Sequence, residues 1–321
     1  MNADQREPMS VEVFTAGEAM ALLLAEDRQP LRRADRFLRS IAGSESNVAI
    51  GLARLGHRVA YCGRVGVDAP GGWVRDALQA ESIDTSGLLS DPVRSTGLIL
   101  RDSPASRPIS VSYYRRDSAG AALGLSDVRP EVIAGASVVF LSGITVMLSD
   151  SSEQFVARVL DIAAEAGVPV VFDPNVRLRL ANRQEWRTRL GRYLDRVDTL
   201  LIGNDELTLL DLPDDPARLL TARRTTVVVK RGASGATACT SAGTVHVPGR
   251  KVEALDPIGA GDAFCAGWIS AFLRKCTVQE SLREAAAVAS LVVATLTDTA
   301  GAPSAVERDW ALQENGSDVD R

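Results

Sequence analysis

The residue types best suited to chemistry stand together in one short run, 256–268, which reads DPIGAGDAFCAGW. Within it, Gly259, Ala260 and Gly261 come directly before a pattern of apolar residues with helical spacing. Small residues at the start of a helix let backbone N–H groups approach an anion, and the helix end adds a partial positive charge. This arrangement suits a phosphoryl group on which negative charge develops during transfer.

Asp262 falls in the first turn of this predicted helix. The positive helix end favours the ionised carboxylate. Beside a phosphate-binding loop, such a carboxylate can accept the proton of a hydroxyl whose oxygen attacks a γ-phosphate. Gly-rich helix starts are common, however, and an ordinary first-turn acid has the same local sequence. The spacing alone therefore leaves a catalytic and a structural interpretation of Asp262 open.

The elements that must position this run alternate between strands and helices. Short apolar strands are predicted at 137–143, 168–174, 199–204 and 225–230. Helices are predicted between them, at 151–167 and through Trp186 to Leu194. Strands that alternate with helices indicate βαβ units, and so a mostly parallel sheet with helices on both faces.

Two segments, about 19–41 and 96–116, interrupt this alternation. In the second, GLILRD and PISVSYYR have the pattern of two arms of an antiparallel hairpin, and 237–248 is a further hairpin candidate. An antiparallel insertion on a parallel α/β body often serves as a lid. We therefore expect residues 1–321 to form one α/β domain with a small β-sheet lid, and the ends 1–10 and 313–321 to be flexible.

The composition excludes several classes of function. The 321 residues are 45% apolar and 24% charged, as in globular proteins. With 36 Lys and Arg against 41 Asp and Glu, the net charge of −5 gives no bulk attraction for nucleic acid or an anionic membrane. No apolar run reaches the ~18 residues of a membrane-spanning helix. Four scattered cysteines without a Cys-x-x-Cys pair indicate neither a zinc site nor disulfides, and predict a reduced, cytoplasmic setting.

Two rival functions stay open from the residues alone. An NAD-dependent oxidoreductase needs G-x-G-x-x-G directly after its first strand, whereas this chain has Gly17-Glu18-Ala19 there. A non-catalytic protein that senses a sugar or nucleotide is the second rival, and the intact run around Asp262 argues against it.

The chain resembles the ribokinase-like carbohydrate kinases, the PfkB family. The family signature D-x-x-G-A-G-D-x-F is matched by Asp256, Gly259, Ala260, Gly261, Asp262 and Phe264. A second signature, a glycine with Asn four residues later at a helix start, is matched by Gly43 and Asn47, and a third by Gly66, Asp68 and Gly71. The motifs occur in the family's order, and the resemblance spans roughly residues 11–305. It implies a ribokinase-like three-layer sandwich and an ATP-dependent sugar kinase.

The resemblance also implies roles for the matched residues. Asp262 would be the general base, and the backbone of Gly259, Ala260 and Gly261 would form the anion hole. The chemistry implies Mg²⁺ beside the ATP phosphates, and a monovalent cation is a further candidate cofactor.

The nucleotide would be bound by Lys230, Gly232 and Gly235, which match a K-x-G-x-x-G loop, and by Asn204. Glu206 would act on the magnesium through water. The family places Asn three residues before this Glu, but here Gly203 stands at that position and Asn204 is shifted by one. A helix-start cap is the alternative interpretation of this segment.

Two segments resemble 2-keto-3-deoxygluconate kinases in particular. Residues 113–123, YYRRDSAGAAL, place Tyr113 and Arg115 in the acceptor pocket, and 172–180, FDPNVRLRL, place Arg177 there. Arginine offers a planar, permanently charged donor pair for the carboxylate of a sugar acid. Without the resemblance, the arginines would be read as solvated residues and Tyr113 as a packing residue.

The remaining acceptor residues implied by the resemblance are Gly43 and Asn47, on the sugar side, and Asp298, which matches a family acid near the substrate. Ile99 departs from the family, because many of these kinases have a Tyr there that reaches the sugar. A site that lacks a hydrogen bond to a substrate hydroxyl discriminates differently. Fructose, ribose and other keto-acid sugars therefore stay open as acceptors. The resemblance further implies a homo-oligomer, a dimer or higher, assembled through the lid.

Overall fold

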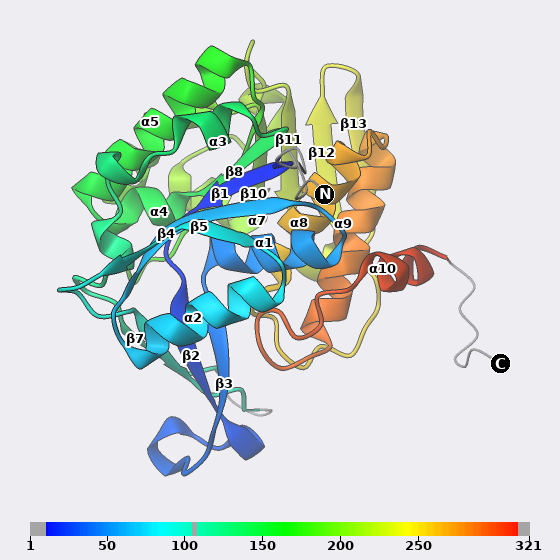
Figure 1. The fold of residues 1–321 in the computed structure, drawn as a ribbon. Helices are drawn as coiled ribbons and strands as arrows, with labels where there is room; N and C mark the ends of the chain where they lie inside the picture. The colour runs from blue at the N-terminus through cyan, green and yellow to red at the C-terminus, as the bar shows by residue number, and fades with distance from the viewer. Residues whose placement is uncertain (1–10, 105–107, 314–321) are drawn as a thin grey trace, which may run out of the picture.

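The computed structural model describes residues 11–104 and 108–313. Its body is a nine-stranded sheet in the order β13-β12-β11-β10-β9-β8-β1-β4-β5 (Figure 1). The strands are β1 (Val13–Ala16), β4 (Val59–Gly66), β5 (Asp84–Asp91), β8 (Val138–Ser142), β9 (Val170–Asp173), β10 (Thr199–Gly203), β11 (Thr226–Lys230), β12 (Ala236–Thr240) and β13 (Gly243–Val247). All pairs from β5 to β11 are parallel, and β12 and β13 add an antiparallel hairpin. The predicted parallel sheet and the hairpin at 237–248 are confirmed.

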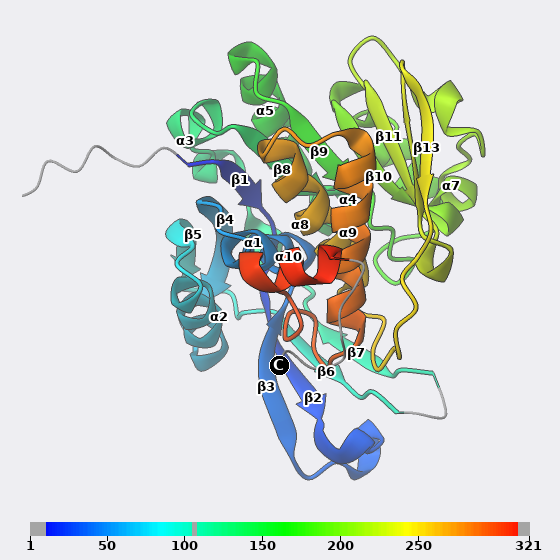
Figure 2. The ribbon, with the colours of Figure 1, turned by 90° about the vertical axis from the view of Figure 1, so that its right-hand side faces the viewer.

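Helices cover both faces of this sheet (Figures 1 and 2). The helices are α1 (Ser44–Arg54), α2 (Ala69–Ala80), α3 (Pro130–Ala134), α4 (Gly143–Leu148), α5 (Asp150–Ala166), α6 (Arg183–Leu190), α7 (Asn204–Leu210), α8 (Ala260–Leu273), α9 (Val278–Val293) and α10 (Ala305–Leu312). In β8, Val139 and Leu141 pack into the core under α5, whereas Val138 and Phe140 pack into the core under α1 and α8. Because both faces of a parallel sheet are buried, its strands are apolar throughout.

A second, four-stranded sheet projects from the bottom of the body, below α2 in the view of Figure 1. It has the order β3-β2-β6-β7, with the strands β2 (Met20–Ala25), β3 (Phe37–Ala42), β6 (Leu98–Arg101) and β7 (Val111–Tyr114). The predicted lid and its hairpin are therefore present. The sheet is mixed rather than purely antiparallel, because β2 and β6 leave the body from separate segments in the same direction and pair in parallel.

Some boundaries differ from those the sequence predicts. The helix expected to continue to Leu194 ends at Leu190, where Gly191 caps it, and a short 3-10 turn follows at Leu194–Arg196. The predicted flexible ends 1–10 and 313–321 lie outside the described residues, apart from Gln313.

Two findings bear on the setting of the protein. The four cysteines are free thiols, three of them buried. Over the described ranges, no helix has both the length and the apolar character needed to cross a bilayer. The cytoplasmic setting stays a prediction.

Candidate active site

Helix α8 places Asp262 at the junction of three segments. The helix begins at Ala260, and its N-cap, Gly259, has φ +86°. A Cβ atom at Gly259 would lie 2.4 Å from the backbone oxygen of Asp298, so both the conformation and the space require glycine. This turn puts Asp262 in the first helical turn, as predicted, with its side chain turned inward and only 8% of the residue exposed.

The carboxylate of Asp262 accepts hydrogen bonds from three side chains. Ser44 Oγ donates to Oδ1 at 2.7 Å, and Asn175 Nδ2 donates to the same oxygen at 3.2 Å. Asn47 Nδ2 donates to Oδ2 at 2.8 Å. Ser44 and Asn47 come from the first turn of α1, and Asn175 follows β9. Sequence motifs that are far apart in the chain thus meet at one carboxylate.

The pKa of Asp262 is raised from 3.8 to about 6. Burial is the main cause, because it penalises the charged form. The hydrogen bonds from Asn47 and Ser44 act in the opposite direction, the nearby carboxylate of Asp173 raises the pKa further, and Arg177 lowers it. A carboxyl group with this pKa is ionised at neutral pH and is still a stronger proton acceptor than an exposed aspartate.

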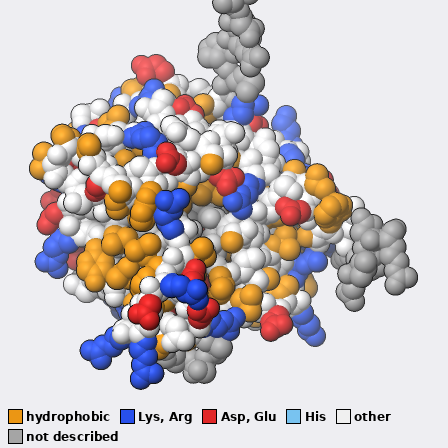
Figure 3. Space-filling view, turned by 60° about the horizontal axis from the view of Figure 1, so that its bottom comes forward, with side chains coloured by type: hydrophobic (Ala, Val, Ile, Leu, Met, Phe, Trp, Pro, Cys, Tyr) orange, Lys and Arg blue, Asp and Glu red, His pale blue; other side chains and the backbone are white. Residues whose placement is uncertain are grey.

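Two cavities flank the run that leads into α8. The larger, of about 1010 Å³, includes Ile258 in its lining, and the smaller, of about 520 Å³, includes Ala260 and Gly261. The backbone between Ile258 and Gly261 therefore separates the two. Viewed from the lid end, Lys and Arg side chains are intermixed with Asp and Glu over the described surface (Figure 3), so positive charge is not gathered into one broad patch there.

The larger cavity contains three of the six residues predicted to bind the acceptor, whereas Gly43, Asn47 and Asp298 do not line it. Tyr113, Arg115 and Arg177 all line it. Six arginines contribute to its lining: Arg64, Arg94, Arg115, Arg116, Arg177 and Arg179. A cavity with this lining suits an anionic ligand.

The two predicted acceptor arginines differ in their partners. Arg115 forms an ion pair with the buried Glu18, whose other carboxylate oxygen accepts from Ser118 Oγ at 2.5 Å. The guanidinium of Arg177 donates to a backbone oxygen, that of Val176, at 3.1 Å, and has no carboxylate partner among the described residues. Of these two arginines, Arg177 is therefore the one whose charge remains available to a ligand.

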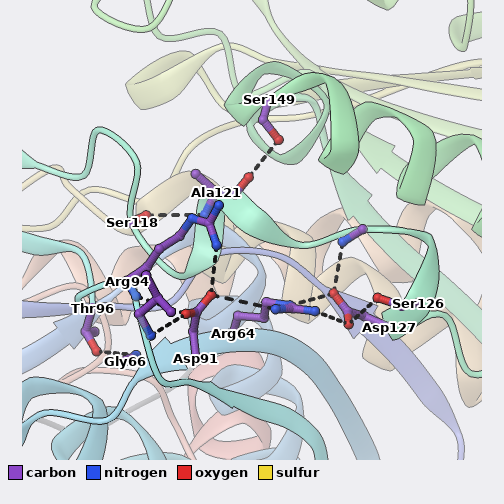
Figure 4. Close-up of polar contacts among 12 residues, drawn as sticks. Arg64, Gly66, Asp91, Arg94, Thr96, Ser118, Ala121, Ser126, Asp127 and Ser149 are labelled. Carbon is purple, nitrogen blue, oxygen red and sulfur yellow. Dashed lines mark hydrogen bonds and ion pairs between the residues drawn. The ribbon is translucent and has the colours of Figure 1, made fainter.

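Arg64 and Arg94, at another side of the larger cavity, are also neutralised (Figure 4). Arg64 binds Asp127 through two nitrogens, each at 2.7 Å, and lies 3.7 Å from Asp91. Arg94 lies 3.4 Å from the same Asp91. These pairs connect β4 to Asp91 in β5 and to Asp127. They leave little unpaired charge on Arg64 and Arg94.

The smaller cavity contains the predicted nucleotide residues Lys230, Gly232, Gly235 and Gly261. Lys230 Nζ lies 2.5 Å from Asp173 Oδ2. Burial lowers the pKa of Lys230, but Asp173 and the neighbouring Cys265 and Glu206 raise it more, so the ammonium stays charged. A Cβ atom at Gly261 would meet Lys230 Nζ at 3.8 Å and nothing nearer, so this backbone is open towards the cavity.

The two predicted loop glycines differ in their surroundings. Gly235 has φ +90°, and a Cβ atom there would lie 2.0 Å from the backbone oxygen of Val247. Gly232 has φ +55° and open space around it. Gly235 is therefore needed by the packing of the loop, whereas Gly232 leaves room at the cavity.

Asn204 and Glu206 both have partners within the protein. Glu206 accepts from Val176 N at 2.5 Å and from Gly203 N at 2.7 Å, and so caps α7. Burial and then Asp173 raise the pKa of Glu206. Asn204 Oδ1 accepts from Arg231 at 2.5 Å, and the smaller cavity is lined by its neighbours Gly203 and Asp205 instead. The roles of Asn204 and Glu206 towards nucleotide and metal stay predictions.

The smaller cavity offers backbone donors for the phosphates of ATP rather than a set of side-chain ligands for magnesium. Gly261 leaves an open backbone at the start of a 14-residue helix, which is a suitable place for phosphate oxygens. In the part of the chain that the structure describes, no group of three or more His, Cys, Asp or Glu side chains is arranged to hold a metal ion. A magnesium ion bound mainly by phosphates and water is compatible with this donor set.

Asp298 and the glycine at the start of α1 lie on the body side of the site. Asp298 accepts from Arg101 at 2.6 Å and from Asn47 at 3.4 Å, and it does not line the larger cavity. Gly43 has φ +147°, and a Cβ atom there would lie 2.3 Å from the backbone oxygen of Glu18. Gly43 thus brings the lid segment close to α1.

Ser44, Asn175 and Arg101 are site residues to which the sequence assigned no role, although Asn175 matches the family segment. Ser44 follows Gly43 within the second family signature, and Asn175 belongs to the matched segment 172–180, so their positions carried a signal. Arg101 lies in the predicted hairpin without any motif, and only the tertiary structure brings it to Asp298.

Comparison with known proteins finds similar sequences and folds over most of the chain. A family described as pfkB family carbohydrate kinase matches residues 11–305. The chain is 30% identical over 303 residues to a 2-dehydro-3-deoxygluconokinase of Bacillus subtilis (strain 168), covering 92% of this chain and 94% of that protein. It is 28% identical over 307 residues to a 5-dehydro-2-deoxygluconokinase of Lacticaseibacillus casei, covering 92% and 94%.

A solved structure, a putative Ribokinase II from E. coli in complex with ATP and Mg²⁺, superposes with a TM-score of 0.87. Its sequence is 24% identical, and the match covers 95% of this chain and 100% of that one. The ribokinase-like fold predicted for the body and its small lid is thus confirmed.

Proposed function

The chain belongs to the pfkB family of carbohydrate kinases, and on that premise we propose that it transfers the γ-phosphate of ATP to a primary hydroxyl of 2-keto-3-deoxygluconate. One observation carries the proposal. Asp262 stands at the helix start whose preceding backbone separates an arginine-lined cavity from a glycine-lined one. We assign the acceptor to the first cavity and the nucleotide to the second, so that the acceptor hydroxyl and the transferred phosphoryl group meet beside Asp262.

Asp262 is the proposed general base. Its two oxygens offer about four acceptor positions, and Ser44, Asn175 and Asn47 occupy three of them. These donors orient the carboxylate and leave one position for the acceptor hydroxyl. As the hydroxyl oxygen bonds to the γ-phosphorus and the bond to the β,γ-bridging oxygen breaks, Asp262 takes the hydroxyl proton and ADP leaves.

The backbone of Gly259, Ala260 and Gly261 is the proposed anion hole. Its N–H groups and the N-terminus of α8 stabilise the negative charge on the transferring group. Lys230 adds a charge at the floor of the smaller cavity, although Asp173 balances part of it. Magnesium, when bound with ATP, would neutralise phosphate charge.

Arg177 is the proposed recognition residue for the substrate carboxylate. Its guanidinium faces the larger cavity without a carboxylate partner among the residues described, whereas Arg115 is paired with Glu18. We assign Arg115 to the shape of the pocket and to the support of Tyr113, whose ring centroid lies 5.8 Å from the guanidinium carbon. Both relatives named above are kinases of deoxy keto sugar acids by name, which supports an anionic acceptor.

Ile99 does not rule out a polar contact from the lid. Ile99 pairs with Tyr113 across β6 and β7, and residues directly opposite each other point to the same face of the sheet. Tyr113 is 39% exposed and lines the larger cavity. Its hydroxyl can therefore supply the contact that a Tyr at position 99 would provide.

A coupled assay of ADP release tests the proposal. The acceptor panel contains 2-keto-3-deoxygluconate, 2-keto-3-deoxygalactonate, fructose, ribose, tagatose and adenosine, each with ATP and magnesium. We expect the keto-deoxy acids to give the highest kcat/KM. A preference for fructose or ribose would support the proposed kinase activity but contradict the proposed acceptor.

The assay also separates the rival classes of function. Absence of turnover with every acceptor, together with binding of sugar or nucleotide, would favour a sensing protein. Stabilisation by NAD rather than by ATP with magnesium in a thermal-shift experiment would favour an oxidoreductase.

A further inference from the structure

Arg101 is a buried cation that the lid inserts into the body of the protein. It is the last residue of β6, and its side chain is only 2% exposed. Its Nη1 donates to Asp298 Oδ1 at 2.6 Å, and its Nη2 lies 3.0 Å from Asp256 Oδ2. Asp256 is fully buried, and Asp298 is 7% exposed. One guanidinium from the lid thus binds two buried carboxylates from two different loops.

These two loops both contact the start of α8. Asp256 begins the run that leads into the helix, and its Oδ1 accepts from Ile258 N at 3.0 Å. Asp298 follows α9, and its backbone lies directly against Gly259, where a Cβ atom would be 2.4 Å from the Asp298 oxygen. Figure 2 shows the loop after α9 passing beside the lid strands. Arg101 therefore ties together the two segments that meet at Gly259.

A further contact extends this connection to Asp262. Asn47 Nδ2 donates to Asp298 Oδ2 at 3.4 Å and to Asp262 Oδ2 at 2.8 Å. The position of Asp298 therefore affects the amide that orients the carboxylate of Asp262. The path runs from Arg101 through Asp298 and Asn47 to Asp262, and every member of it is buried.

The charges explain why this cation matters. A buried carboxylate without a counter-charge is costly, and removing one partner of a buried pair leaves the other uncompensated. Among the residues that the structure describes, Arg101 is the one cation that forms an ion pair with Asp256 or Asp298. Asp256 Oδ2 has no hydrogen-bond donor of its own, so its compensation depends on this guanidinium.

We propose that Arg101 is a positioning residue, with which the lid holds the anion-hole loop and the Asp262 carboxylate in their working geometry. Arg101 touches neither cavity and contacts no reacting atom. The proposal rests on the proposed function, in which Asp262 and the start of α8 act on the transferred group. It adds that the lid contributes to catalysis through a buried charge as well as by covering the sugar.

Three variants of the full-length protein test this role. Arg101→Gln removes the charge and keeps a polar side chain, Arg101→Lys restores the charge, and Arg308→Gln is a matched control. Arg308 is also a buried arginine paired with carboxylates, Glu284 and Asp309, but it lies on α10. We expect Arg101→Gln to lower kcat by roughly 10²-fold, the scale of a small misplacement at an active site. The KM values for ATP and sugar should change much less, Arg101→Lys should recover part of the rate, and Arg308→Gln should leave it unchanged.

Hydrogen–deuterium exchange gives a second readout that does not need turnover. We expect amides of residues 257–262 and 297–300 to exchange faster in Arg101→Gln than in the wild type, and to stay protected in Arg308→Gln. Unchanged exchange in these loops, or a kcat close to the wild-type value in a folded Arg101→Gln, would overturn the proposal. If the wild type phosphorylates no acceptor, the proposed function fails, and the exchange data still decide whether Arg101 orders these loops.

Chemical rescue distinguishes the lost charge from general damage. In Arg101→Ala, guanidinium chloride at concentrations far below those that unfold the protein should restore part of the turnover and the protection. Potassium chloride at the same ionic strength should restore less of both, because it lacks the planar pair of donors. If Arg101→Ala does not fold, the Gln and Lys variants carry the test alone. No rescue in a folded Arg101→Ala with a slow rate would count against a charge held in this place.

Discussion

Asn47 and Asp262 lie 215 residues apart in the chain, yet the amide of Asn47 donates to the carboxylate of Asp262 at 2.8 Å. The first turn of α1 therefore fixes the orientation of an acid in the first turn of α8. The same amide reaches Asp298 at 3.4 Å. One side chain thus joins the starts of α1 and α8 to the loop that follows α9.

Replacing the proposed base tests the chemistry most directly. We expect Asp262→Asn to lower kcat by at least ~10²-fold, the scale of lost general-base catalysis. The raised pKa of Asp262 means that its charge is disfavoured in the folded protein, so the neutral amide should not lower the melting temperature at neutral pH. The KM values, kcat and a thermal melt check this. A variant that keeps its turnover would show that Asp262 is not the base.

The pH dependence should report the same group. Asp262 must be ionised to accept a proton, and burial raises its pKa to about 6. We therefore expect turnover to be constant above this pH and to fall about tenfold per pH unit below it. A profile of kcat against pH from 4 to 8, in buffers of constant ionic strength, measures this limb. An acid limb near the ordinary aspartate value of 3.8 would contradict the assignment.

Removing the Asn47 amide should shift that limb. A hydrogen bond to the ionised carboxylate lowers the pKa of Asp262. Asn47→Ala removes this donor, so the pKa of Asp262 should rise and the acid limb should move to higher pH. The rate on the plateau should also fall, because the carboxylate is held less firmly. Arg308→Gln again serves as the control, and an unshifted limb in a folded Asn47→Ala would count against the coupling.

Gly259 should tolerate no side chain. Gly259→Ala places a Cβ atom 2.4 Å from the Asp298 oxygen at φ +86°, and backbone strain of this kind costs about 1–3 kcal/mol. We expect a lower free energy of unfolding. We also expect a lower kcat, with a smaller change in the KM for the sugar. Gly56→Ala is the matched control, since Gly56 has φ +94° with nothing within 4 Å. Gly56→Ala should lose some stability and no activity, as urea unfolding and the kinase assay would measure.

The acceptor preference should depend on Arg177. A hydrogen bond between charged groups contributes roughly 1.5–3 kcal/mol, so Arg177→Met should raise the KM for the keto-deoxy acid by about 10-fold or more. Weak activity on neutral sugars should change much less at a pH well above the pKa of Asp262, which Arg177 also lowers. Arg179→Met is the control, since Arg179 lines the same cavity and donates to the backbone of Val111. Equal losses in both variants would mean that Arg177 contributes only general positive charge.

Most of the architecture could be predicted because strands and helices leave patterns in short stretches of the sequence. The strands of the body are apolar on both faces and are separated by helical segments, and the motif run predicted that Asp262 lies in the first turn of α8. The parallel pairing of β2 and β6 was not predicted, because no local pattern reports how two distant segments come together. The early end of α6 at Gly191 depended on a cap that competed with an otherwise helical pattern.

The site was predicted where a motif marked it and missed where only packing created it. Asn47, Lys230 and Arg177 were found through signatures, and the structure brings them around Asp262 or its two cavities. The ion pair between Arg115 and Glu18 was not predicted, although it decides which arginine is free for a ligand. Arg101 lies in a segment without a signature, and its partners come from loops about 150 to 200 residues later.

Because the backbone between Ile258 and Gly261 separates the two cavities, the acceptor preference of such a protein can change during evolution. The residues that would choose the alcohol come from the lid and from the segment after β9, whereas those that would hold the phosphate donor come from β11 and α8. A mutation of a residue that lines only the larger cavity can therefore change the acceptor preference while the residues of the smaller cavity stay the same. New acceptor preferences become accessible by small steps, and an engineer seeking one would leave the helix start alone and vary Tyr113, Arg115 and Arg177.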